Sequence, residues 1–588
     1  MLPAPSPTDE FTVADKWELT AAARGSHPCL VQIPDERSAE RSLSFSQVDS
    51  SANQVASWAA SKGMKKGDAV ALFMENCPEF VISWVGLAKQ GLVTAWINNT
   101  IKLQPLVHSI RVAAARAVLF GAELADVVEA VHGDLAKEGI ESFCLGASPA
   151  FCRGIDADIA AQPNKAPAKR ARDGVQFKDT MCYIYTSGTT GLPKAAVIGH
   201  MRYINAGGGF GQRIRNLAPG VLYGSGMPLY HGTAGMLGIG ATVVAGITYL
   251  IRKKFSAASW LNDIRTYNAT SAQYIGELAR YVLATPERVD DSNNSLRFCS
   301  GNGLRPECWE KFQVRFGIDF ILEFYGATEG TASLNNVTAL TDIQQGKRAG
   351  IGSVGRLDNL RVRFVRYDVD ADEYVRGPDG FCLPVETNEP GEMLVCETAD
   401  NLFRGYTDGA ASKKKLVKDV FEKGDLYFRT GDLLRFDKDG WVYFVDRIGD
   451  TFRWKGENVS TAEVATELAS FAGVDEVNVY GVQIPNNEDG RAGMCAMVME
   501  DASEERLAAF YRHAAASLPP YAVPLFLRIQ PAMMITGTFK HQKVQLRNEG
   551  FDPSKVKDVL YYLDSGKYKM LDAEAYRRIT QGGPRSRL

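Results

Sequence analysis

Helix-period and strand-like apolar patterns alternate along the first ~150 residues, which predicts layered α/β structure. Gly67 and Asp68 turn the chain into an apolar strand over residues 69–74, and Pro78 suits the first turn of a helix over residues 79–89. Before them, Ser46 and Asp49 cap a helix whose apolar face carries Val48, Ala52, Val55 and Ala59. The N-terminal part of the chain is therefore expected to belong to the α/β class.

The pattern changes after two Asp-Gly turns. Residues 378–380 and 437–440 predict hairpins, and the second turn leads into an apolar strand over residues 441–445. Beyond residue 446, a capping box at residues 460–463 opens one helix, and a second helix runs over residues 505–518 among strand-like runs. We therefore divide the chain into a large α/β domain, residues 1–446, and a small mobile α+β domain, residues 447–588.

Length and composition narrow the class of protein. A chain of 588 residues exceeds what one hydrophobic core usually supports, which agrees with two domains. With 45% hydrophobic residues, 23% charged residues and a net charge of −3, the composition is that of a soluble globular protein, and no nucleic-acid partner is indicated. Ten scattered cysteines without Cys-x-x-Cys spacing indicate thiols in a reducing compartment, not a disulfide framework or a zinc site. A basic stretch is interpreted as a solvated linker; it holds Lys165, Lys169, Arg170 and Arg172.

Residues 216–251 contain no Lys, Arg, Asp or Glu and are long enough for a membrane span. Their content of Gly, Thr, Tyr and Pro favours a buried core or a pocket wall, with peripheral membrane contact left open. His231 in this segment suits a core histidine and a pocket residue equally well. Nearby glycines remove side-chain volume, which an elongated pocket and tight packing would both use; they are Gly207, Gly208, Gly209, Gly224, Gly226, Gly232, Gly235 and Gly238.

The most distinctive pattern is an apolar strand over residues 181–185 that breaks into a loop of hydroxyls and glycines. Backbone N–H and side-chain O–H groups of such a loop can bind phosphate oxygens, and Lys194 adds a point charge. The spacing differs from the Gly-x-x-x-x-Gly-Lys-[Ser/Thr] loop of NTPases. The predicted phosphate-binding residues are Tyr185, Thr186, Ser187, Gly188, Thr189, Thr190, Gly191 and Lys194.

This loop resembles the signature of the adenylate-forming enzymes, which comprise acyl-CoA synthetases, luciferases and nonribosomal-peptide adenylation domains. The resemblance implies that ATP binds here and that a carboxylate attacks its α-phosphate, with Thr186 in a catalytic position. Residues 324–330 look like the magnesium-binding motif of that family, and Glu329 is a hard oxygen ligand suited to Mg²⁺. Thr328 is expected to bind the α-phosphate and Tyr325 to stack on adenine, with Gly326 and Ala327 between them. Alone, such a Glu between glycines is more often a surface residue.

Two further motifs follow in the chain order of the same family. Gly301, Asn302 and Gly303 resemble its adenine-side loop, although a tight turn explains them too. Asp432 stands at a strand end, where a carboxylate can accept hydrogen bonds from both ribose hydroxyls. Arg447 is a candidate second contact to ribose or phosphate. A turn-capping Asp is the alternative reading of Asp432.

Lys540 ends a Thr/Gly loop at the position of the family's catalytic lysine, which bridges the carboxylate and the α-phosphate as the bond forms. The family usually has glycine directly before this lysine, whereas this chain has Phe539. Residues 446–460 look like the fatty acid transport protein and very-long-chain acyl-CoA synthetase branch. The resemblance makes Gly449 the hinge, where the family usually bears Asp or Lys, and lets the pantetheine arm of CoA pass Gly456.

The last residues, Ser586, Arg587 and Leu588, match the peroxisomal Ser-Lys-Leu address with one cation exchanged. The sequence as a whole predicts a long- or very-long-chain fatty acid–CoA ligase that uses ATP, Mg²⁺ and CoA through an acyl-adenylate. In such an enzyme the pocket residue His231 would line an elongated acyl tunnel, and a core histidine stays the alternative. We expect a peroxisomal protein, delivered by the import receptor that reads this tripeptide. The alternative is a fatty acid transport or uptake protein with coupled acyl activation, at the cytoplasmic face of the endoplasmic reticulum or plasma membrane. A luciferase-like oxygenase is a more distant alternative.

Overall fold

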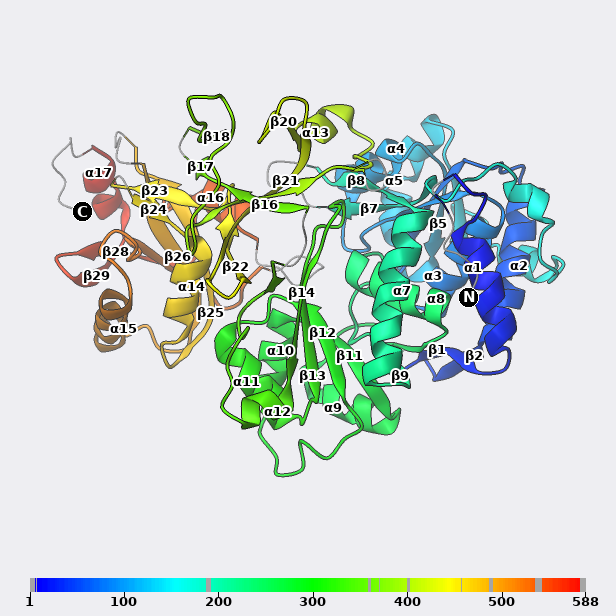
Figure 1. The fold of residues 1–588 in the computed structure, drawn as a ribbon, viewed down its shortest axis with the longest axis horizontal. Helices are drawn as coiled ribbons and strands as arrows, with labels where there is room; N and C mark the ends of the chain where they lie inside the picture. Colours follow the sequence, from blue (N-terminus) through cyan, green and yellow to red (C-terminus); the bar gives the residue numbers. More distant parts are fainter. Residues whose placement is uncertain are drawn as a thin grey trace. The chain divides into compact units, whose positions relative to one another are not determined.

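The regular elements fall into two groups, each built around its own sheets (Figure 1). One unit comprises Met1–Gly355 and Glu397–Lys415, and the other comprises Arg356–Cys396 and Leu416–Leu588. The mixed α/β class predicted from the sequence is confirmed. The computed structural model describes residue 6 and residues 8–36, 38–186, 192–357, 361–369, 371–398, 402–455, 457–485, 490–534 and 542–581.

The strand that leads into the predicted phosphate loop lies in a sheet with the order β6-β5-β3-β4-β7-β8. Neighbouring strands of this sheet run parallel, except that β7 and β8 are antiparallel. Strand β3 is buried along its whole length, which suits a strand covered on both faces. The strands are β3 (Ala69–Phe73), β4 (Val93–Trp96), β5 (Ala115–Gly121), β6 (Glu141–Leu145), β7 (Thr180–Thr186) and β8 (Lys194–Gly199).

A second sheet of the same unit has the order β14-β13-β12-β11-β9-β10-β1-β2. Strands β11, β12 and β13 run parallel, so their carboxyl ends meet at one edge, where ligands bind in open α/β sheets. The strands are β1 (Pro28–Gln32), β2 (Arg41–Ser44), β9 (Val221–Tyr223), β10 (Thr248–Ile251), β11 (Ala269–Ile275), β12 (Phe298–Asn302), β13 (Phe320–Tyr325) and β14 (Leu334–Ala339).

Helices cover both sheets, and the helix predicted over residues 79–89 is confirmed as α3. The predicted cap of α2 is wrong by two residues. The Ser44 hydroxyl accepts from the Gln47 N–H, and the Gln47 side chain accepts from the Ser44 N–H, so Ser46 falls inside the first turn. The helices are α1 (Val13–Arg24), α2 (Phe45–Ser61), α3 (Pro78–Lys89), α4 (Leu103–Val112), α5 (Ala125–Lys137), α6 (Asp156–Ala160), α7 (His200–Leu217), α8 (Ile239–Ala245), α9 (Ala257–Thr266), α10 (Gly276–Leu283), α11 (Pro306–Arg315), α12 (Leu340–Gln344) and α13 (Gly409–Lys413).

The uncharged residues 216–251 form short elements: strand β9, a π-helical segment (Gly232–Gly238), helix α8 and strand β10. Among the described residues, no helix is both long and apolar enough to cross a membrane. Several glycines serve close packing: a Cβ on Gly207 would lie 2.6 Å from the backbone of Gly240, and one on Gly235 would lie 2.2 Å from the Leu229 carbonyl oxygen. The volume that these two glycines remove is therefore occupied by neighbouring backbone.

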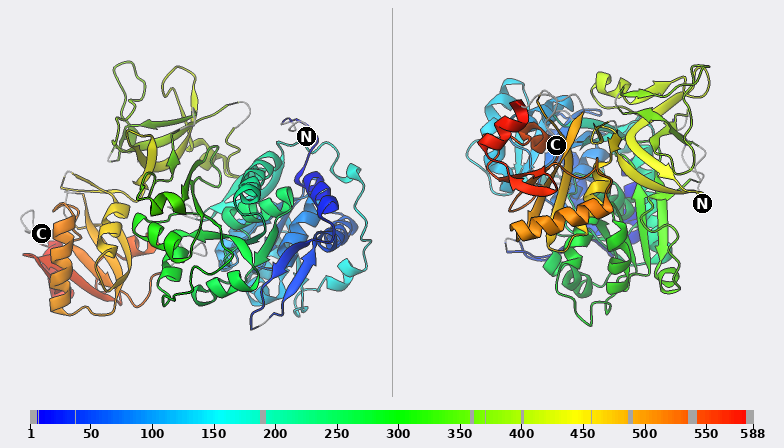
Figure 2. Two further views of the ribbon diagram at one scale, coloured as in Figure 1. Left: turned by 60° about the horizontal axis from the view of Figure 1, so that its bottom comes forward. Right: turned by 90° about the vertical axis from the view of Figure 1, so that its left-hand side faces the viewer.

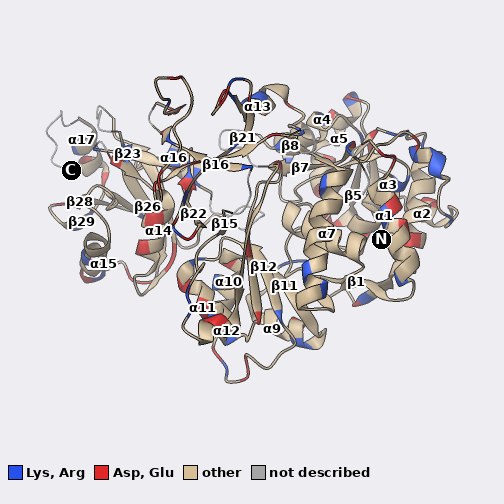
Figure 3. Ribbon diagram, in the orientation of Figure 1, with Lys and Arg blue, Asp and Glu red and all other residues tan. Residues whose placement is uncertain are grey.

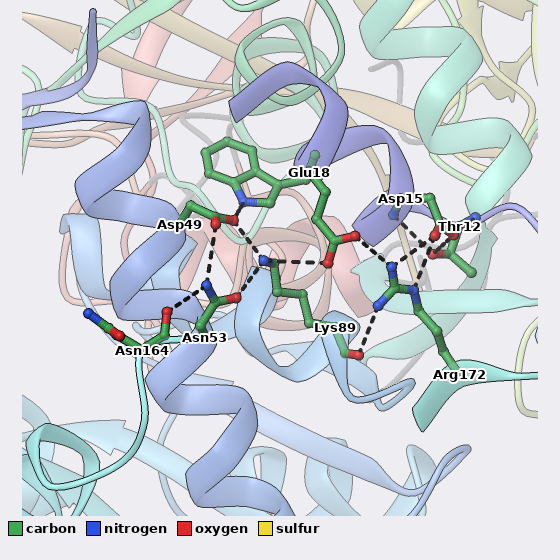
Figure 4. A network of polar contacts seen from close by, with 9 residues as sticks. Thr12, Asp15, Glu18, Asp49, Asn53, Lys89, Asn164 and Arg172 are labelled. Carbon is green, nitrogen blue, oxygen red and sulfur yellow. Dashed lines mark hydrogen bonds and ion pairs between the residues drawn. The ribbon is translucent and has the colours of Figure 1, made fainter. Parts of the chain in front are cut away.

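A buried polar network joins α1, α2, α3 and the basic stretch before β7 (Figure 4). The Lys89 ammonium group is fully buried and lies 2.7 Å from Asp49 and 3.5 Å from Glu18. Arg172 is 3% exposed, and its guanidinium group lies 2.8 Å from both Asp15 and Glu18. The interpretation of this stretch as a solvated linker is therefore wrong for Arg172, because carboxylates of α1 neutralise its charge inside the protein.

The second unit begins with a sheet of the order β15-β22-β21-β19-β16, with β20 paired to β21. The turn at residues 437–440 joins β21 and β22 as the predicted hairpin. The strands of this sheet are β15 (Gly355–Arg356), β16 (Val362–Val365), β19 (Gly391–Cys396), β20 (Leu416–Lys418), β21 (Leu426–Phe436) and β22 (Trp441–Arg447). Two separate two-stranded sheets are formed by β17 (Tyr367–Asp368) with β18 (Glu373–Tyr374), and by β23 (Phe452–Trp454) with β24 (Glu457–Val459).

A further sheet in this unit has the order β25-β26-β27-β28-β29, and helix α15 lies along it (Figure 2). Helix α14 begins where predicted, because the Ser460 hydroxyl accepts from the Glu463 N–H. Basic and acidic residues are interspersed along the chain (Figure 3), in keeping with its small net charge. The elements are α14 (Thr461–Ala469), β25 (Val474–Gln483), β26 (Arg491–Met499), α15 (Glu504–Ser517), β27 (Phe526–Ile529), α16 (Val544–Glu549), β28 (Val559–Asp564), β29 (Lys567–Met570) and α17 (Ala573–Gln581).

Candidate active site

The buried Glu323 carboxylate on β13 holds the predicted adenine-side turn at the end of β12 through hydrogen bonds. Its Oε1 accepts from the N–H groups of Gly303 at 2.5 Å and Leu304 at 3.2 Å, and its Oε2 accepts from the Tyr274 hydroxyl at 2.6 Å. Burial raises the pKa of Glu323 to about 8, and these hydrogen bonds oppose the shift. A Cβ on Gly301 would lie 2.2 Å from the Tyr274 carbonyl oxygen, so the strand can approach this closely only with glycine there.

The predicted magnesium motif follows β13 and is held through its backbone by Arg202 of α7. The guanidinium group donates to the carbonyl oxygens of Ala327, at 2.9 Å, and Gly330. The Gly330 N–H donates to the Ala327 carbonyl oxygen at 3.0 Å, so the two anchored residues close one turn around Thr328 and Glu329. Burial lowers the pKa of Arg202 to about 10, and the nearby Glu329 charge opposes this, so Arg202 remains a cation at neutral pH.

Tyr406 connects the two predicted phosphate-binding loops. Its hydroxyl donates to Oε1 of Glu329 at 2.7 Å and shares a hydrogen bond with Thr186 at the end of β7. The Lys194 ammonium nitrogen lies 5.8 Å from the centre of the Tyr406 ring, within cation–π range. Burial, together with the Glu329 charge, raises the pKa of Tyr406, so its hydroxyl stays protonated and remains a hydrogen-bond donor.

The backbone around Tyr406 explains how it reaches this place. Tyr406 pairs with Ala196 in a bridge on β8, and the Val197 N–H donates to the Gly405 carbonyl oxygen at 3.0 Å. The strand that begins at Lys194 therefore carries Tyr406 beside it. Further along the same segment, the Lys415 ammonium group lies 3.8 Å from Glu329. Three basic side chains, those of Arg202, Lys194 and Lys415, thus lie at or near this motif, which favours an anionic ligand.

The predicted phosphate loop is described only at its ends. Ser187, Gly188, Thr189, Thr190 and Gly191 lie outside the described residues. Thr186 and Lys194 are direct partners in the antiparallel pairing of β7 and β8, so the loop begins and ends at adjacent strand positions. The Tyr185 hydroxyl donates to the Ser109 carbonyl oxygen at 2.5 Å, so it is engaged within the protein.

The segment around His231 lies beside the magnesium motif. Nδ1 of His231 accepts a long hydrogen bond of 3.5 Å from the Thr233 N–H. A Cβ on Gly232 would stand 3.7 Å from the Thr328 hydroxyl oxygen, which puts this turn in contact range of the motif. The turn that contains Gly232 therefore adjoins the motif, and an acyl-pocket role for His231 stays a prediction.

In the second unit, the two predicted ribose residues face each other. Asp432 on β21 pairs with Arg447 on β22, and their charged groups lie 3.7 Å apart. The Gly431 N–H donates to the buried Glu392 carboxylate at 3.0 Å, and the Thr430 hydroxyl donates to the Met393 carbonyl oxygen at 2.7 Å. These bonds fix the turn that presents Asp432.

Other predicted residues are placed in part. Gly449 lies in the turn after β22, whereas Gly456, Lys540 and the tripeptide at residues 586–588 lie outside the described residues. The sequence reasoning missed Glu323, Arg202 and Tyr406. Arg202 carried one local signal, a cation in the first turn of a helix, where the helix dipole disfavours positive charge. Tyr406 carried none, because its partner Glu329 is 77 residues away in the chain.

Comparisons with known proteins show which family this chain resembles. The AMP-binding enzyme family matches residues 17–407. Long-chain fatty acid transport protein 2 of Rattus norvegicus is 42% identical over 553 residues, which is 92% of this chain and 87% of the relative. Long-chain fatty acid transport protein 1 of Homo sapiens is 40% identical over 558 residues, 92% of this chain and 83% of the relative.

Solved structures share the fold. An anthranilate CoA ligase in complex with anthranoyl-AMP superposes with a TM-score of 0.75 at 21% identity and covers 92% of this chain and 97% of its own. A fatty acyl CoA synthetase of Mycobacterium tuberculosis gives a TM-score of 0.63 at 21% identity, over 91% of this chain and 98% of its own. Together with the family match over residues 17–407, this fold confirms the predicted arrangement of a large adenylate-forming domain and a smaller C-terminal domain.

Proposed function

Because the chain belongs to the AMP-binding enzyme family, we propose that it is a long- or very-long-chain fatty acid–CoA ligase. One observation carries this proposal: the Tyr406 hydroxyl is hydrogen-bonded to both Thr186 and Glu329. These two residues belong to the two loops suited to binding ATP. The names of its relatives, long-chain fatty acid transport proteins, support a long acyl substrate.

In the first half-reaction, a fatty carboxylate oxygen attacks the α-phosphorus of ATP, and the bond to pyrophosphate breaks. Thr186, Lys194 and residues 187–191 bind the phosphates, Thr328 contacts the α-phosphate, and Tyr325 with residues 301–303 holds adenine. Asp432 and Arg447 bind the ribose. Lys540 stabilises the charge that develops between carboxylate and phosphate.

Glu329 is the proposed ligand of Mg²⁺, and its surroundings fit that role. One carboxylate combined with nucleotide phosphates is the ligand set typical of Mg²⁺ in such sites. The described residues contain no cluster of three or more His, Cys, Asp or Glu that would hold a metal by itself. When bound, Mg²⁺ neutralises phosphate charge. Tyr406 fixes the Glu329 carboxylate, and Arg202 fixes the turn that bears it.

In the second half-reaction, the CoA thiol loses its proton to solvent, its sulfur attacks the acyl carbon, and AMP leaves with the electron pair of the broken bond. We propose that the small domain, residues 447–588, turns about Gly449 between the two steps. This motion withdraws Lys540 and brings Gly456 beside the pantetheine arm. Gly449 suits a hinge because glycine adopts a wide range of backbone angles.

The experiment that tests the function incubates purified protein with Mg-ATP, CoA and carboxylates from medium to very long chain. Pyrophosphate and acyl-CoA are measured together. The proposal expects both products in equal amounts, with a maximum at a long acyl chain. Pyrophosphate without thioester would mean another acyl acceptor, and neither product across the panel would contradict ligation.

A second candidate function is fatty acid uptake at a membrane with coupled activation, which the names of the relatives favour. Flotation with liposomes, followed by a salt wash, separates peripheral from integral attachment. If uptake is the main role, we expect the protein to float with the liposomes. Fatty acid accumulation should then persist in a variant that cannot form the adenylate.

We also propose peroxisomal delivery through the tripeptide Ser586, Arg587 and Leu588. A fluorescent fusion that preserves this C-terminus is expected to co-localise with a peroxisomal marker. Deletion of the three residues should disperse it, and an unchanged pattern after deletion would contradict the proposal.

A further inference from the structure

Two basic side chains, those of Arg547 and Lys543, contact the turn that contains Gly449. Nη1 of Arg547, on α16, donates to the Gly449 carbonyl oxygen at 2.7 Å, and Nη2 lies 3.3 Å from Oδ1 of Asp450. The Lys543 ammonium group lies 3.6 Å from Oδ2 of the same Asp450. The side chain of Asp450 is 14% exposed, so these contacts are shielded from solvent more than an ordinary surface ion pair.

Lys543 also reaches the beginning of the turn. Its ammonium group donates to the Thr461 hydroxyl oxygen at 2.6 Å, and this hydroxyl donates to the buried Asp446 carboxylate at 3.0 Å. Asp446 further accepts from the Thr461 N–H at 2.5 Å, which caps α14. The two carboxylates that bracket the turn, Asp446 and Asp450, are therefore linked through Lys543.

These contacts hold one peptide unit at the centre of the turn. The Gly449 carbonyl group and the Asp450 N–H belong to one planar peptide unit. Arg547 holds the oxygen of that unit and the side chain that follows it. The oxygen of the peptide unit between Gly449 and Asp450 is thus attached to α16, while its N–H donates to the Arg447 carbonyl oxygen at 2.9 Å. A swing about Gly449 must therefore release one of these two attachments.

The same helix follows the proposed catalytic lysine directly. Lys543 stands three positions after Lys540, and α16 begins at Val544. We propose that Lys543 and Arg547 are positioning residues: they carry the Gly449–Asp450 peptide with the small domain and thereby set where Lys540 is delivered. This inference rests on the proposed function, which assigns the hinge to Gly449 and catalysis to Lys540.

The test combines a readout of the turn itself with both half-reactions. Arg547→Met keeps an apolar stem but removes the donors, and Arg547→Lys keeps a cation without the two-pronged guanidinium geometry. Asp450→Asn is the second variant, because it removes the charge partner at nearly constant shape. Lys569→Met is the matched control, since it removes an exposed ion pair with Asp564 elsewhere in the same region.

Limited trypsin digestion of the whole protein reports cleavage after Arg447, Arg453 and Lys455, and thermal denaturation reports global stability. We expect Arg547→Met and Asp450→Asn to be cut there about tenfold faster, because charged hydrogen bonds that close the turn are lost. The ratio of adenylation to thioesterification rates should shift by at least about threefold, with partial recovery in Arg547→Lys.

Three outcomes are decisive. Wild-type cleavage and an unchanged rate ratio would overturn the inference, and so would an equal fall of both half-reactions that follows a loss of thermal stability. If the wild-type protein forms no acyl-adenylate while the variants are still cut faster, the proposed function and the positioning role fail, and only the anchoring of the turn stands.

Discussion

At the scale of single residues, the hydroxyl of Tyr406 has the largest effect on how the candidate site is arranged. This hydroxyl is hydrogen-bonded to both Glu329 and Thr186. In Tyr406→Phe the ring remains and the Glu329 carboxylate loses a hydrogen bond. A hydrogen bond to a charged group contributes about 1.5–3 kcal/mol, so we expect adenylation to slow by about 10- to 100-fold, while thioesterification of supplied acyl-adenylate changes little.

Tyr223→Phe provides the matched control for this substitution. The Tyr223 hydroxyl donates to a carboxylate oxygen of Asp263 at 2.6 Å, so the same chemical group is removed from the same kind of partner on different elements. Pyrophosphate release measured for both variants separates local from general effects. Equal slowing in the two would show that Tyr406 acts only through stability.

Lys540 is the other residue whose role can be isolated. Lys540→Ala is expected to lower acyl-adenylate formation by about 100- to 1,000-fold, because it removes a donor from the charge that develops in the transition state. Thioesterification of supplied acyl-adenylate should persist, since the proposed second step does not use this lysine. An equal loss of both half-reactions, with Lys569→Ala as the unaffected control, would refute the assignment.

At the scale of elements, His200 links the first turn of α7 to the start of α1. Its Nδ1 accepts from the Val13 N–H at 3.1 Å, which requires the unprotonated ring. Burial lowers the pKa of His200 to about 4, although Asp179 and Asp15 oppose the shift. Above pH ~6.5 the ring is neutral in both folded and unfolded chains. As the pH falls from ~6.5 to ~4, only the unfolded chain gains the proton, so stability decreases by up to about 3 kcal/mol.

Urea denaturation at several pH values tests this expectation. His200→Asn keeps an acceptor for the Val13 N–H but does not titrate. The variant should lose less stability than the wild-type protein between pH ~7.5 and ~4.5, and the difference should approach about 3 kcal/mol. Parallel curves for the two proteins would contradict a neutral, buried His200.

Arg172 joins the stretch before β7 to α1 (Figure 4). Arg172→Met leaves Asp15 and Glu18 without their shared cation, and Asp15 is only 13% exposed. We expect a loss of about 3 kcal/mol in the free energy of unfolding, since removal of one partner leaves a partly buried charge uncompensated. The exposed neighbour Arg170, changed to Met, should shift stability by less than about 0.5 kcal/mol. Similar shifts in both variants would contradict this account.

Elements with strong periodicity could be predicted from the sequence, and long-range partners could not. Helix α3 and strand β3 follow from their apolar patterns and the turn residues before them. The cap of α2 was misplaced because two serines compete within three positions. The burial of Arg172 was missed because Asp15 is 157 residues away, and no local pattern encodes that pairing.

The same limit applies to the candidate site. The loops that carry Thr186 and Glu329 were recognisable from local composition, because glycines and hydroxyls follow apolar strands there. Their connection through Tyr406 depends on a segment that pairs with β8 from far along the chain. Local chemistry is therefore readable in sequence, whereas the groups that orient it are set by tertiary packing.

At the scale of the whole molecule, the proposed reaction depends on a change at the turn after β22. Gly449 does not adopt a positive φ in this structure, so its backbone conformation does not itself strain alanine in Gly449→Ala. Proline fixes φ near −65° and therefore restricts the rotation that the hinge requires. We expect Gly449→Pro to change the ratio of adenylation to thioesterification rates by at least about tenfold, and Gly449→Ala to stay within about threefold.

Both half-reactions are measured separately, with supplied acyl-adenylate for the second. Wild-type rates for both steps in Gly449→Pro would place the swing elsewhere. A selective loss of one step would locate it at Gly449, whose carbonyl oxygen accepts from Arg547.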